Sequence, residues 1–542
     1  MSELIYKKYL KETLNSQNML VGAEFDIPKN FNFGYDVVDE LGKKIPNKTA
    51  MIWVSKDFKE RYFTFKDIAD YSNKTANYFA SLGIKRGDKV MLVLKRHYQF
   101  WFAIIALHKL GATAVPATNL LLKKDFDYRF NLANIDAIVC TADGDVANEV
   151  DLASVTSPSL KTKIIVNGER EGWHNFNEGI EPMSTLFSRV ETNANDPMLM
   201  YFSSGTTGYP KAAIHSFSYA IGHIITARWW HNVQEDGVHF TVADTGWGKA
   251  VWGKLYGQWF CEACIFVFDF DRFHPNEMLP MFAKYNITTF CAPPTIYRFL
   301  IKEDLTNYNL SSLKYCTIAG EALNPEVFKQ WYQATGIKPM EGFGQTETTL
   351  TVGNLVGMQP KPGSMGKPSP QYKVVLLNTE SQQIKDGEVG EICIDTTKVP
   401  VGLFSGYNNA EVTAEAWHDN YYHTGDMAWR DEDGYFWYVG RTDDLIKSSG
   451  YRIGPFEIES VLMELPCVLE CAVTGAPHPI RGQVVKATIV LAKGFEGTEE
   501  LKLQIQEYVK THTAPYKYPR IIDFTTSLPK TISGKIKHKD IH

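Results

Sequence analysis

PMLMYFSSGTTGYPKAAIHS, residues 197–216, joins an apolar run to a loop of hydroxyl-bearing and turn-forming residues that contains one lysine. The apolar run is typical of a buried strand, so the loop follows the carboxyl end of that strand, where α/β sheets bind ligands. Its backbone N–H groups, hydroxyls and cation suit an anion with several oxygens. It is not a Walker A loop, because Gly205 and Gly208 lie too close together and Pro210 precedes Lys211. The stretch predicts a phosphate loop of another kind, although a surface turn is the alternative for the loop taken alone.

The residues around this loop repeat one rhythm, in which short apolar runs alternate with helical patterns from about residue 50 to residue 341. Such alternation is typical of βαβ units around mostly parallel sheets. From residue 363 to about residue 397, apolar runs alternate with turn residues instead, which predicts antiparallel strands. A glycine loop and a helix opened by Pro455 then follow.

We therefore predict an α/β protein with two domains. The N-terminal domain, residues 1–442, contains parallel-sheet βαβ layers and an antiparallel β subdomain. The C-terminal domain, residues 443–542, is small, mobile and α+β. The boundary lies in GRTDD, residues 440–444, between a strand and a polar loop.

The chain has 542 residues, 44% of them hydrophobic, and a formal net charge of −6 at pH 7. These values suit a globular protein and argue against a basic surface for nucleic acid or an anionic membrane. The apolar stretch 101–115 is interrupted by His108, Lys109 and Gly111, so we expect no membrane span. The N-terminal residues lack the apolar core of a secretory signal and are too acidic for a transit peptide, which predicts a cytoplasmic protein.

Eight cysteines in so large a chain favour reduced thiols over a disulfide framework. Cys261 and Cys264 have the spacing of a zinc or redox pair. They lie, however, in an apolar run with no second ligand pair nearby in the sequence. A buried structural role is therefore favoured for both.

Five polar stretches occur in a fixed order along the chain. They are SSGTTGYPK (203–211), EGFGQTET (341–348), YYHTGD (421–426), GRTDDLIKSSGYRIGPFEIE (440–459) and PKTISGK (529–535). In this order and at these separations they resemble the adenylate-forming enzymes: acyl-CoA synthetases, luciferases and peptide-synthetase adenylation domains. Within that group the chain most resembles the medium-chain acyl-CoA synthetases, on ADTGWGKAVW (243–252), CAPPTIYR (291–298) and APYKYPR (514–520). The resemblance extends from about residue 32 to residue 537.

The resemblance implies a two-step ligase. A carboxylic acid attacks the α-phosphate of ATP to give an acyl-adenylate and pyrophosphate, and coenzyme A then takes the acyl group while AMP leaves. Mg²⁺ is the implied metal, and the first step needs the departing phosphates to be held and their charge neutralised. The implied ATP-binding residues are Ser203, Ser204, Gly205, Thr206, Thr207, Gly208, Tyr209, Pro210, Lys211, Glu341, Gly342, Phe343, Gly344, Gln345, Thr346, Asp426 and Arg441.

Within this set, the resemblance places Phe343 against adenine, Thr346 at the α-phosphate, and Asp426 with Arg441 at the ribose. Glu347 is the implied magnesium ligand, and its carboxylate suits a hard cation. Taken singly, each of these residues is more often a turn former or a solvated surface group.

Lys535 and Arg452 are the implied catalytic residues. Lysine carries a compact charge on a flexible stem, which suits a group that bridges the attacking carboxylate and the α-phosphate. Asp443 matches the hinge about which the C-terminal domain rotates between the two steps and withdraws Lys535. The implied CoA-binding residues are Ser449, Gly450, Tyr451, Arg481, Lys510, Tyr518, Pro519 and Arg520.

The acyl pocket is predicted from Gly344, Thr346 and Trp247. The acetyl-CoA synthetases that the chain resembles carry tryptophan at the position of Gly344, where the indole closes the pocket. Glycine therefore predicts an open pocket for medium-chain, branched or small aromatic acids, since each buried methylene adds about 0.8 kcal/mol. Trp247 is expected to cap the other side, with a core position as the alternative.

Two other functions stay open from the sequence: a non-catalytic nucleotide-binding relative, and an adenylation enzyme that loads an acyl carrier protein. The intact set of polar stretches argues against the first, and the CoA-type APYKYPR segment argues against the second. The sequence does not give the oligomeric state, and a homodimer is among the options.

Overall fold

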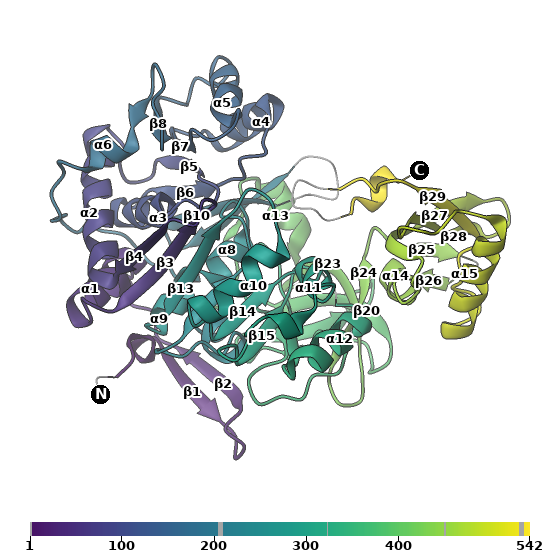
Figure 1. The fold of residues 1–542 in the computed structure, drawn as a ribbon. Helices are drawn as coiled ribbons and strands as arrows, with labels where there is room; N and C mark the ends of the chain where they lie inside the picture. Colours follow the sequence, from purple (N-terminus) through teal and green to yellow (C-terminus); the bar gives the residue numbers. More distant parts are fainter. Residues whose placement is uncertain (1–2, 204–209, 322, 449–450, 531–535, 542) are drawn as a thin grey trace.

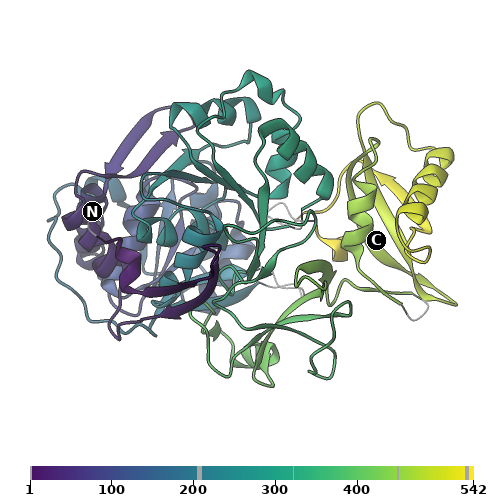
Figure 2. The same cartoon turned by 90° about the horizontal axis from the view of Figure 1, so that it is seen from below.

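The computed structural model describes residues 3–203, 210–321, 323–448, 451–530 and 536–541. Within these ranges the chain forms a large body, and a smaller lobe made from the C-terminal residues stands beside it (Figures 1 and 2). A hairpin of β1 (Leu10–Leu14) and β2 (Leu20–Phe25) lies at the edge of the body near the N-terminus.

Two large, mostly parallel sheets make up most of the body in the described residues. The first has the order β21 (Gly406–Tyr407), β11 (Lys211–Ser216), β10 (Pro197–Ser203), β6 (Thr113–Pro116), β5 (Lys89–Val93), β7 (Ala137–Thr141), β8 (Thr162–Val166) and β9 (His174–Asn175). The second has the order β18 (Lys367–Pro368), β17 (Val352–Gly353), β16 (Pro339–Phe343), β15 (Tyr315–Ile318), β14 (Thr289–Ala292), β12 (Val238–Thr241), β13 (Cys264–Asp269), β3 (Thr49–Ser55) and β4 (Glu60–Thr64). The strands from β10 to β9 and from β16 to β3 pair in parallel, which confirms the expected βαβ layers.

Helices cover these sheets because parallel strands need crossover connections. Those of the body are α1 (Glu40–Lys44), α2 (Phe65–Ser81), α3 (Gln99–Leu110), α4 (Lys123–Ala133), α5 (Val146–Ser154), α6 (Phe176–Ile180), α7 (Tyr219–Ile225), α8 (Gly248–Gly253), α9 (Tyr256–Phe260), α10 (Pro275–Lys284), α11 (Pro294–Leu300), α12 (Pro325–Thr335) and α13 (Ala410–Ala416). Helix α2 begins with a capping box between Thr64 and Asp67, which satisfies amide groups that the first turn leaves unbonded.

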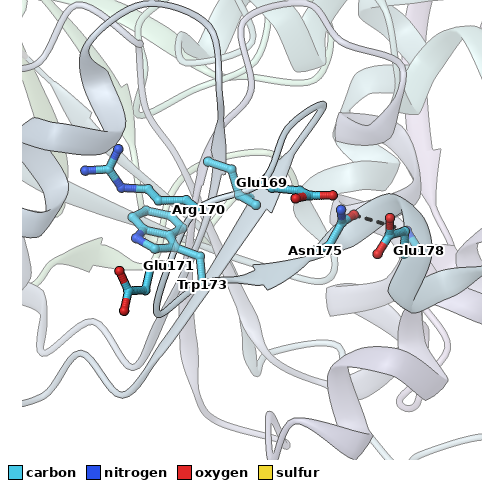
Figure 3. A pocket seen from close by; sticks show the side chains of 7 residues that line it. Glu169, Arg170, Glu171, Trp173, Asn175 and Glu178 are labelled. Carbon is cyan, nitrogen blue, oxygen red and sulfur yellow. Dashed lines mark hydrogen bonds between the residues drawn. The ribbon is translucent and has the colours of Figure 1, made fainter.

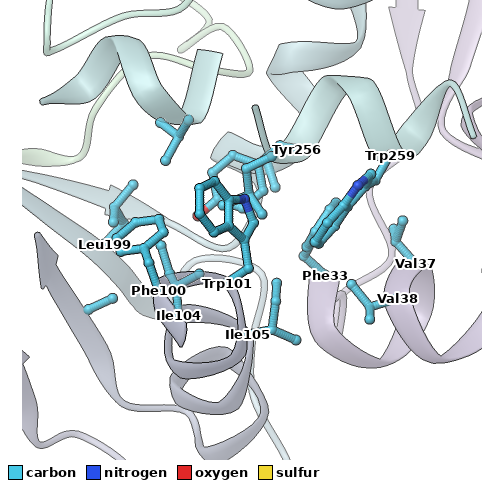
Figure 4. Packing of buried hydrophobic residues seen from close by; sticks show 14 of the residues in the cluster. Phe33, Val37, Val38, Phe100, Trp101, Ile104, Ile105, Leu199, Tyr256 and Trp259 are labelled. Carbon is cyan, nitrogen blue, oxygen red and sulfur yellow. The ribbon is translucent and has the colours of Figure 1, made fainter. Parts of the chain in front are cut away.

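Helix α3 lies at the centre of the largest hydrophobic core (Figure 4). Every side chain of the helix is buried, as expected for a helix that is apolar on all sides. Trp101 reaches toward α9 and donates its indole N–H to the carbonyl of Lys254 at 2.7 Å. The interrupted apolar stretch of the sequence is therefore a core helix. Among the described helices, none is both long and apolar enough to cross a membrane.

Antiparallel strands form a third sheet, as expected from the sequence. Its strands are β19 (Val374–Leu377), β20 (Val389–Asp395), β23 (Tyr421–Arg430), β22 (Trp417–His418) and β24 (Phe436–Arg441).

The C-terminal lobe has a sheet and a hydrophobic core of its own. Its elements are β25 (Ile446–Ser448), β26 (Tyr451–Ile453), α14 (Pro455–Leu462), β27 (Val468–His478), β28 (Gly482–Leu491), α15 (Glu499–His512), β29 (Ile521–Thr525) and the 3-10 helix η5 (His538–Asp540). Pro455 occupies the first turn of α14, as its fixed φ and missing N–H favour. All eight cysteines are free and buried, which confirms the buried position expected for Cys261 and Cys264.

Candidate active site

Within residues 197–216, the two strands that flank the polar loop form the base of a hairpin. Ser203 ends β10 and pairs with Lys211, which begins the antiparallel strand β11. The carbonyl of Pro210 accepts a hydrogen bond from the Tyr128 hydroxyl at 3.0 Å, and the Lys211 ammonium lies 5.3 Å from the centre of the Tyr407 ring. The predicted loop residues Ser204, Gly205, Thr206, Thr207, Gly208 and Tyr209 lie outside the described residues.

Glu347 joins this hairpin to the second large sheet. One carboxylate oxygen, Oε1, accepts hydrogen bonds from the Ser203 hydroxyl at 3.2 Å and the Tyr407 hydroxyl at 2.9 Å. The residue is only 7% exposed. Both recorded donors are neutral, so the described contacts give this buried carboxylate no cationic partner. A buried carboxylate is costly without a compensating charge, and Glu347 therefore fits a metal ligand.

Residues from three of the polar stretches meet at the carboxylate of Asp426. Its Oδ1 accepts from the Tyr438 hydroxyl at 3.0 Å, and its Oδ2 accepts from Arg441 Nη1 at 3.1 Å and from the Gln345 side-chain amide. Asp426 and Arg441 lie directly opposite each other on β23 and β24, so strand pairing brings them together. The Gln345 amide also donates to the carbonyl of Thr424 at 2.8 Å.

The residues before this cluster lie along β16 and end at Phe343. The Phe343 ring lies 6.5 Å from the Tyr438 ring, centre to centre. Gly342 faces the indole of Trp230, where a methyl group on the glycine would lie 2.6 Å from the ring. The Glu341 side chain points into the protein and accepts from the Leu323 amide at 3.1 Å, and burial raises its pKa to about 8. The structure therefore turns the side chain of Glu341 toward the core.

The surroundings of Gly344 differ from the expected open pocket. A methyl group on this glycine would lie 2.3 Å from Cη2 of Trp252 and 2.6 Å from the carbonyl oxygen of Thr349. The indole of Trp252, which comes from α8 and is 6% exposed, therefore fills the side of Gly344 that we expected to be empty. A ring distant in sequence occupies this side of Gly344, and the acyl pocket predicted there stays a prediction.

Thr346 and Trp247 lie in neighbouring loops. The carbonyl of Thr346 accepts from His215 Nε2 at 2.9 Å. A methyl group on Gly248, the residue after Trp247, would lie 3.8 Å from the Cα of Thr346. The structure thus brings two of the predicted acyl-pocket segments side by side, and Trp247 itself is half-buried.

The C-terminal lobe carries paired aromatic rings at the predicted CoA-binding residues. Tyr451 stacks on Tyr516 with ring centres 4.1 Å apart and planes 15° from parallel. The Lys517 ammonium lies 5.7 Å from the Tyr516 ring, and the Arg520 guanidinium lies 4.8 Å from the Tyr518 ring. These surfaces suit an adenine ring and phosphate groups.

Other predicted CoA-binding residues sit farther along the same lobe. Lys510 forms an exposed pair with Glu507 on α15, and Pro519 accepts from the Gln506 amide through its carbonyl. The backbone N–H of Arg481 donates to His478 Nδ1 at 3.3 Å. Ser449 and Gly450 lie outside the described residues.

The predicted hinge residue, Asp443, lies between β24 and β25 and has two cationic neighbours. Lys539 Nζ is 2.8 Å from its Oδ2, and Arg441 Nε is 3.9 Å from its Oδ1. Burial is the largest influence and acts to raise the pKa of Asp443, but the hydrogen bond and charge of Lys539 together with the charge of Arg441 lower that pKa overall. Lys535 lies outside the described residues, and Arg452 is placed by its backbone alone, opposite Lys447 on β25.

Several residues at the site were not predicted from the sequence: Tyr407, Tyr438, Trp252, Tyr516 and Lys539. The place of Tyr516 within APYKYPR was an available clue, whereas Tyr438 reaches Asp426 only through the pairing of β24 with β23. Tyr407 and Trp252 gave no local clue, because each reaches its partner through tertiary packing alone.

A hollow of about 430 Å³ lies on the surface beside β8 and β9 (Figure 3). Glu169, Arg170, Trp173 and Asn175 are among its lining residues, and Arg170 is paired with Asp151 at 2.7 Å. None of the polar stretches contributes to this hollow, so it is not part of the candidate active site.

Comparison with known proteins identifies the family of the chain. Residues 38–408 match the AMP-binding enzyme family, and residues 457–535 match the AMP-binding enzyme C-terminal domain. The chain belongs to the AMP-binding enzyme family. This result confirms the adenylate-forming resemblance and the expected pairing of a large α/β body with a separate C-terminal domain.

Individual relatives of this AMP-binding enzyme are similar over nearly the whole chain. It is 41% identical to the acyl-coenzyme A synthetase ACSM3, mitochondrial, of Rattus norvegicus, over 99% of this chain and 95% of the relative. It is 42% identical to the ACSM4 protein, also named mitochondrial, of Homo sapiens, over 94% of this chain and 90% of the relative. A solved structure of the anthranilate CoA ligase AuaEII in complex with anthranoyl-AMP has a TM-score of 0.86 and 29% identity, covering 94% of this chain and 96% of that one.

The expected cytoplasmic location is wrong. The rat and human relatives of this AMP-binding enzyme are both named as mitochondrial proteins. The prediction rested on the composition of the first residues of the chain, which does not by itself identify the compartment.

Proposed function

We propose that this protein is an AMP-forming acyl-CoA synthetase. It activates a medium-chain, branched or small aromatic carboxylic acid with ATP and transfers the acyl group to CoA. One observation carries the proposal: two hydrogen bonds, from Ser203 to Glu347 and from Gln345 to Asp426, join residues of three separate polar stretches. The names of the similar acyl-coenzyme A synthetases support this reading.

The chemistry explains why such a cluster is needed. A carboxylate is a poor electrophile, and joining it to AMP creates a leaving group that a thiol can displace. The loop 203–211 would hold the phosphates that depart, and Asp426 with Arg441 would hold the ribose. The fit of Glu347 to a metal ligand supports Mg²⁺ there, where the cation would neutralise phosphate charge. Lys535 and Arg452 would stabilise the charge that develops around the α-phosphate.

We place the acyl group beside Trp252, Thr346 and the loop that holds Trp247. The contact between Trp252 and Gly344 supports this, because an indole there gives the acyl chain an apolar wall. An aromatic acid is one option, since the structurally similar AuaEII enzyme was solved with anthranoyl-AMP. The thioester step would use the ring pairs near Tyr451 and Tyr518 on the C-terminal lobe, with Asp443 as the hinge.

The decisive experiment is a panel of acids from acetate to decanoate, with branched acids and benzoate, incubated with ATP, Mg²⁺ and the purified protein. Pyrophosphate, AMP and acyl-CoA are measured with and without CoA. With CoA we expect AMP, pyrophosphate and acyl-CoA in equal amounts. Without CoA we expect pyrophosphate but no acyl-CoA, because AMP stays in the acyl-adenylate. Octanol, the control that lacks a carboxylate, should give no turnover. Formation of ADP and phosphate would contradict the adenylate mechanism. Turnover limited to acetate would contradict the proposed substrate class.

A further inference from the structure

A second group of metal-binding atoms lies on the antiparallel sheet, apart from Glu347. Cys393 on β20 and His423 on β23 face each other directly across the strand pair, and Glu391 lies two residues before the cysteine on the same face. His423 Nδ1 is 3.0 Å from Glu391 Oε2 and 3.4 Å from Cys393 Sγ. Among the described residues, these three donor atoms all lie within 4.8 Å of one another.

We propose that Glu391, Cys393 and His423 form a binding site for a divalent, borderline-soft metal ion of the zinc class. The donor set of nitrogen, sulfur and oxygen is the one that Zn²⁺ takes in proteins, whereas Mg²⁺ prefers oxygen ligands. Zinc–ligand lengths in a tetrahedral site put nitrogen about 3.5 Å from sulfur and about 3.4 Å from oxygen. Both observed separations need to open by less than half an ångström to reach these values.

The surroundings of Glu391 and His423 add orientation and further donors to this set. The second oxygen of Glu391, Oε1, accepts the Gly425 amide at 2.8 Å, which fixes the carboxylate and leaves Oε2 directed at His423. Such hydrogen bonds to a ligand's other atom orient it for the metal. His418, which stacks on His423 with ring centres 3.8 Å apart, and Asp419 lie on the exposed side and supply an entry path and further donors.

Charge also favours a divalent ion. Cys393 is fully buried, and its sulfur lies close to the Glu391 carboxylate. On binding, the metal takes the Nδ1 and Sγ lone pairs. The thiol proton is released to solvent, and the proton on Nδ1 moves to Nε2. A thiolate and a carboxylate then balance the two positive charges, which a half-buried site requires.

The site is connected to the candidate ribose site by the strand that carries both. Glu391 holds the amide of Gly425, which precedes Asp426, and His423 lies three residues before Asp426 on β23. A bound ion would therefore fix β20 against β23 at the base of the Asp426 cluster. The expected consequence is a higher midpoint of thermal unfolding when zinc is present.

Cobalt titration of the full-length protein without ATP tests the proposal, because Co²⁺ bound to a thiolate gives a charge-transfer absorption that Glu347 cannot produce. We expect the band to saturate at one equivalent, to be displaced by Zn²⁺ and to be unaffected by Mg²⁺. Cys393→Ser should abolish the band, and His423→Gln and Glu391→Gln should each weaken binding by about tenfold or more. Cys264→Ala is the matched control, because it also removes a buried cysteine but one outside the proposed site. This variant should keep the band.

Circular dichroism of each variant separates loss of binding from loss of folding. If Cys393→Ser does not fold, the two glutamine variants, which keep the thiol, decide the question through their cobalt affinity. The proposal is overturned if the wild-type protein gives no band, if folded Cys393→Ser keeps it, or if both glutamine variants bind as tightly as wild type. Zinc should also raise the unfolding midpoint of the wild type and leave that of Cys393→Ser unchanged.

Discussion

At the scale of single residues, the candidate site depends on carboxylates whose surroundings differ. Glu347 is buried with neutral hydroxyl donors, Asp426 has an arginine partner, and Glu341 points into the core. The three carboxylates lie within two short motifs, EGFGQTET and YYHTGD, yet each has different partners. Substitutions that keep shape and remove charge therefore separate their roles.

Glu347→Gln should keep the acceptor for Ser203 and Tyr407 while it removes the charge that a magnesium ion needs. We expect the rate of adenylate formation to fall by about 10²–10³-fold. The measurement is ATP–pyrophosphate exchange as a function of Mg²⁺ concentration. Ser203→Ala serves as a control that leaves the carboxylate in place. An unchanged magnesium dependence in the glutamine variant would remove Glu347 from the metal site.

Glu341→Gln should change how stability depends on pH. Burial raises the pKa of Glu341 to about 8, from 4.5 for the free group, so the folded protein keeps a proton that the unfolded chain loses. The stability that this proton provides is fully present below about pH 4.5 and is lost as pH rises toward 8. The unfolding midpoint of the glutamine variant should therefore exceed that of the wild type increasingly from pH 5 to pH 8. Parallel midpoint curves would show that Glu341 is ionised in the folded protein.

Trp252→Ala should open the space that the indole fills beside Gly344. Removing so large a buried side chain costs about 3–5 kcal/mol of stability, and the preference should move toward longer or bulkier acids. The acid panel measures this through kcat/KM, and Trp331→Phe, a change at a buried tryptophan of α12, is the control. An unchanged substrate profile would make Trp252 a core residue only. Gly344→Trp, in turn, should displace the indole and lower stability.

At the scale of elements, the pairing of β23 with β24 forms the Asp426 cluster that we propose for ribose. The register places Asp426 opposite Arg441, and the Tyr438 hydroxyl reaches the same carboxylate from β24. Because cross-strand neighbours are fixed by register, a slip of one residue would turn these side chains to opposite faces. The antiparallel sheet thus fixes the position of the Asp426 carboxylate, which is the group we propose for ribose binding.

Arg441→Gln should weaken ATP binding, because Asp426 loses its cationic partner and Thr424 loses a donor. We expect the KM for ATP to rise by about tenfold, as for the loss of a partly buried charged hydrogen bond. Arg430→Gln is the matched control, since Arg430 lies on β23 in an exposed pair with Asp386 and should have little effect. Equal effects of both changes on KM would contradict a special role for Arg441.

At the scale of the whole molecule, the C-terminal lobe has its own core and is joined to the body by few described contacts around Asp443. The Asn324 amide, at the start of α12, donates to the carbonyl of Ser460 at 3.0 Å, and Tyr438 packs edge-on against Phe456. Interfaces between domains of one chain commonly permit relative motion. The proposed two-step reaction requires such rotation.

Lys535→Ala and Asp443→Pro should separate the two half-reactions. Without its charge at residue 535, the protein should lose about 10²–10³-fold in adenylate formation and still make thioester from preformed acyl-adenylate. Proline at 443 fixes φ and removes an N–H, so adenylate formation should survive while thioester formation fails. Single-turnover kinetics of each half-reaction measure both effects. Equal losses in both steps for Lys535→Ala would contradict its assignment to adenylation.

The sequence by itself determined the elements and the chemistry of the protein. Apolar runs such as those of β5, β7 and β10 predicted parallel strands, and Pro455 marked the start of α14, because these patterns depend on local spacing and local backbone preference. Five ordered stretches were enough to predict the family, since their residue types reflect one reaction.

Tertiary structure alone decided which groups meet. The indole of Trp252 fills the side of Gly344 that the sequence left open, Tyr407 reaches Glu347, and Glu391, Cys393 and His423 converge on two strands. Each of these contacts joins segments that are distant in the chain. Local periodicity says which face of an element is apolar, and only the packing of complete elements fixes which side chain from elsewhere lies against it.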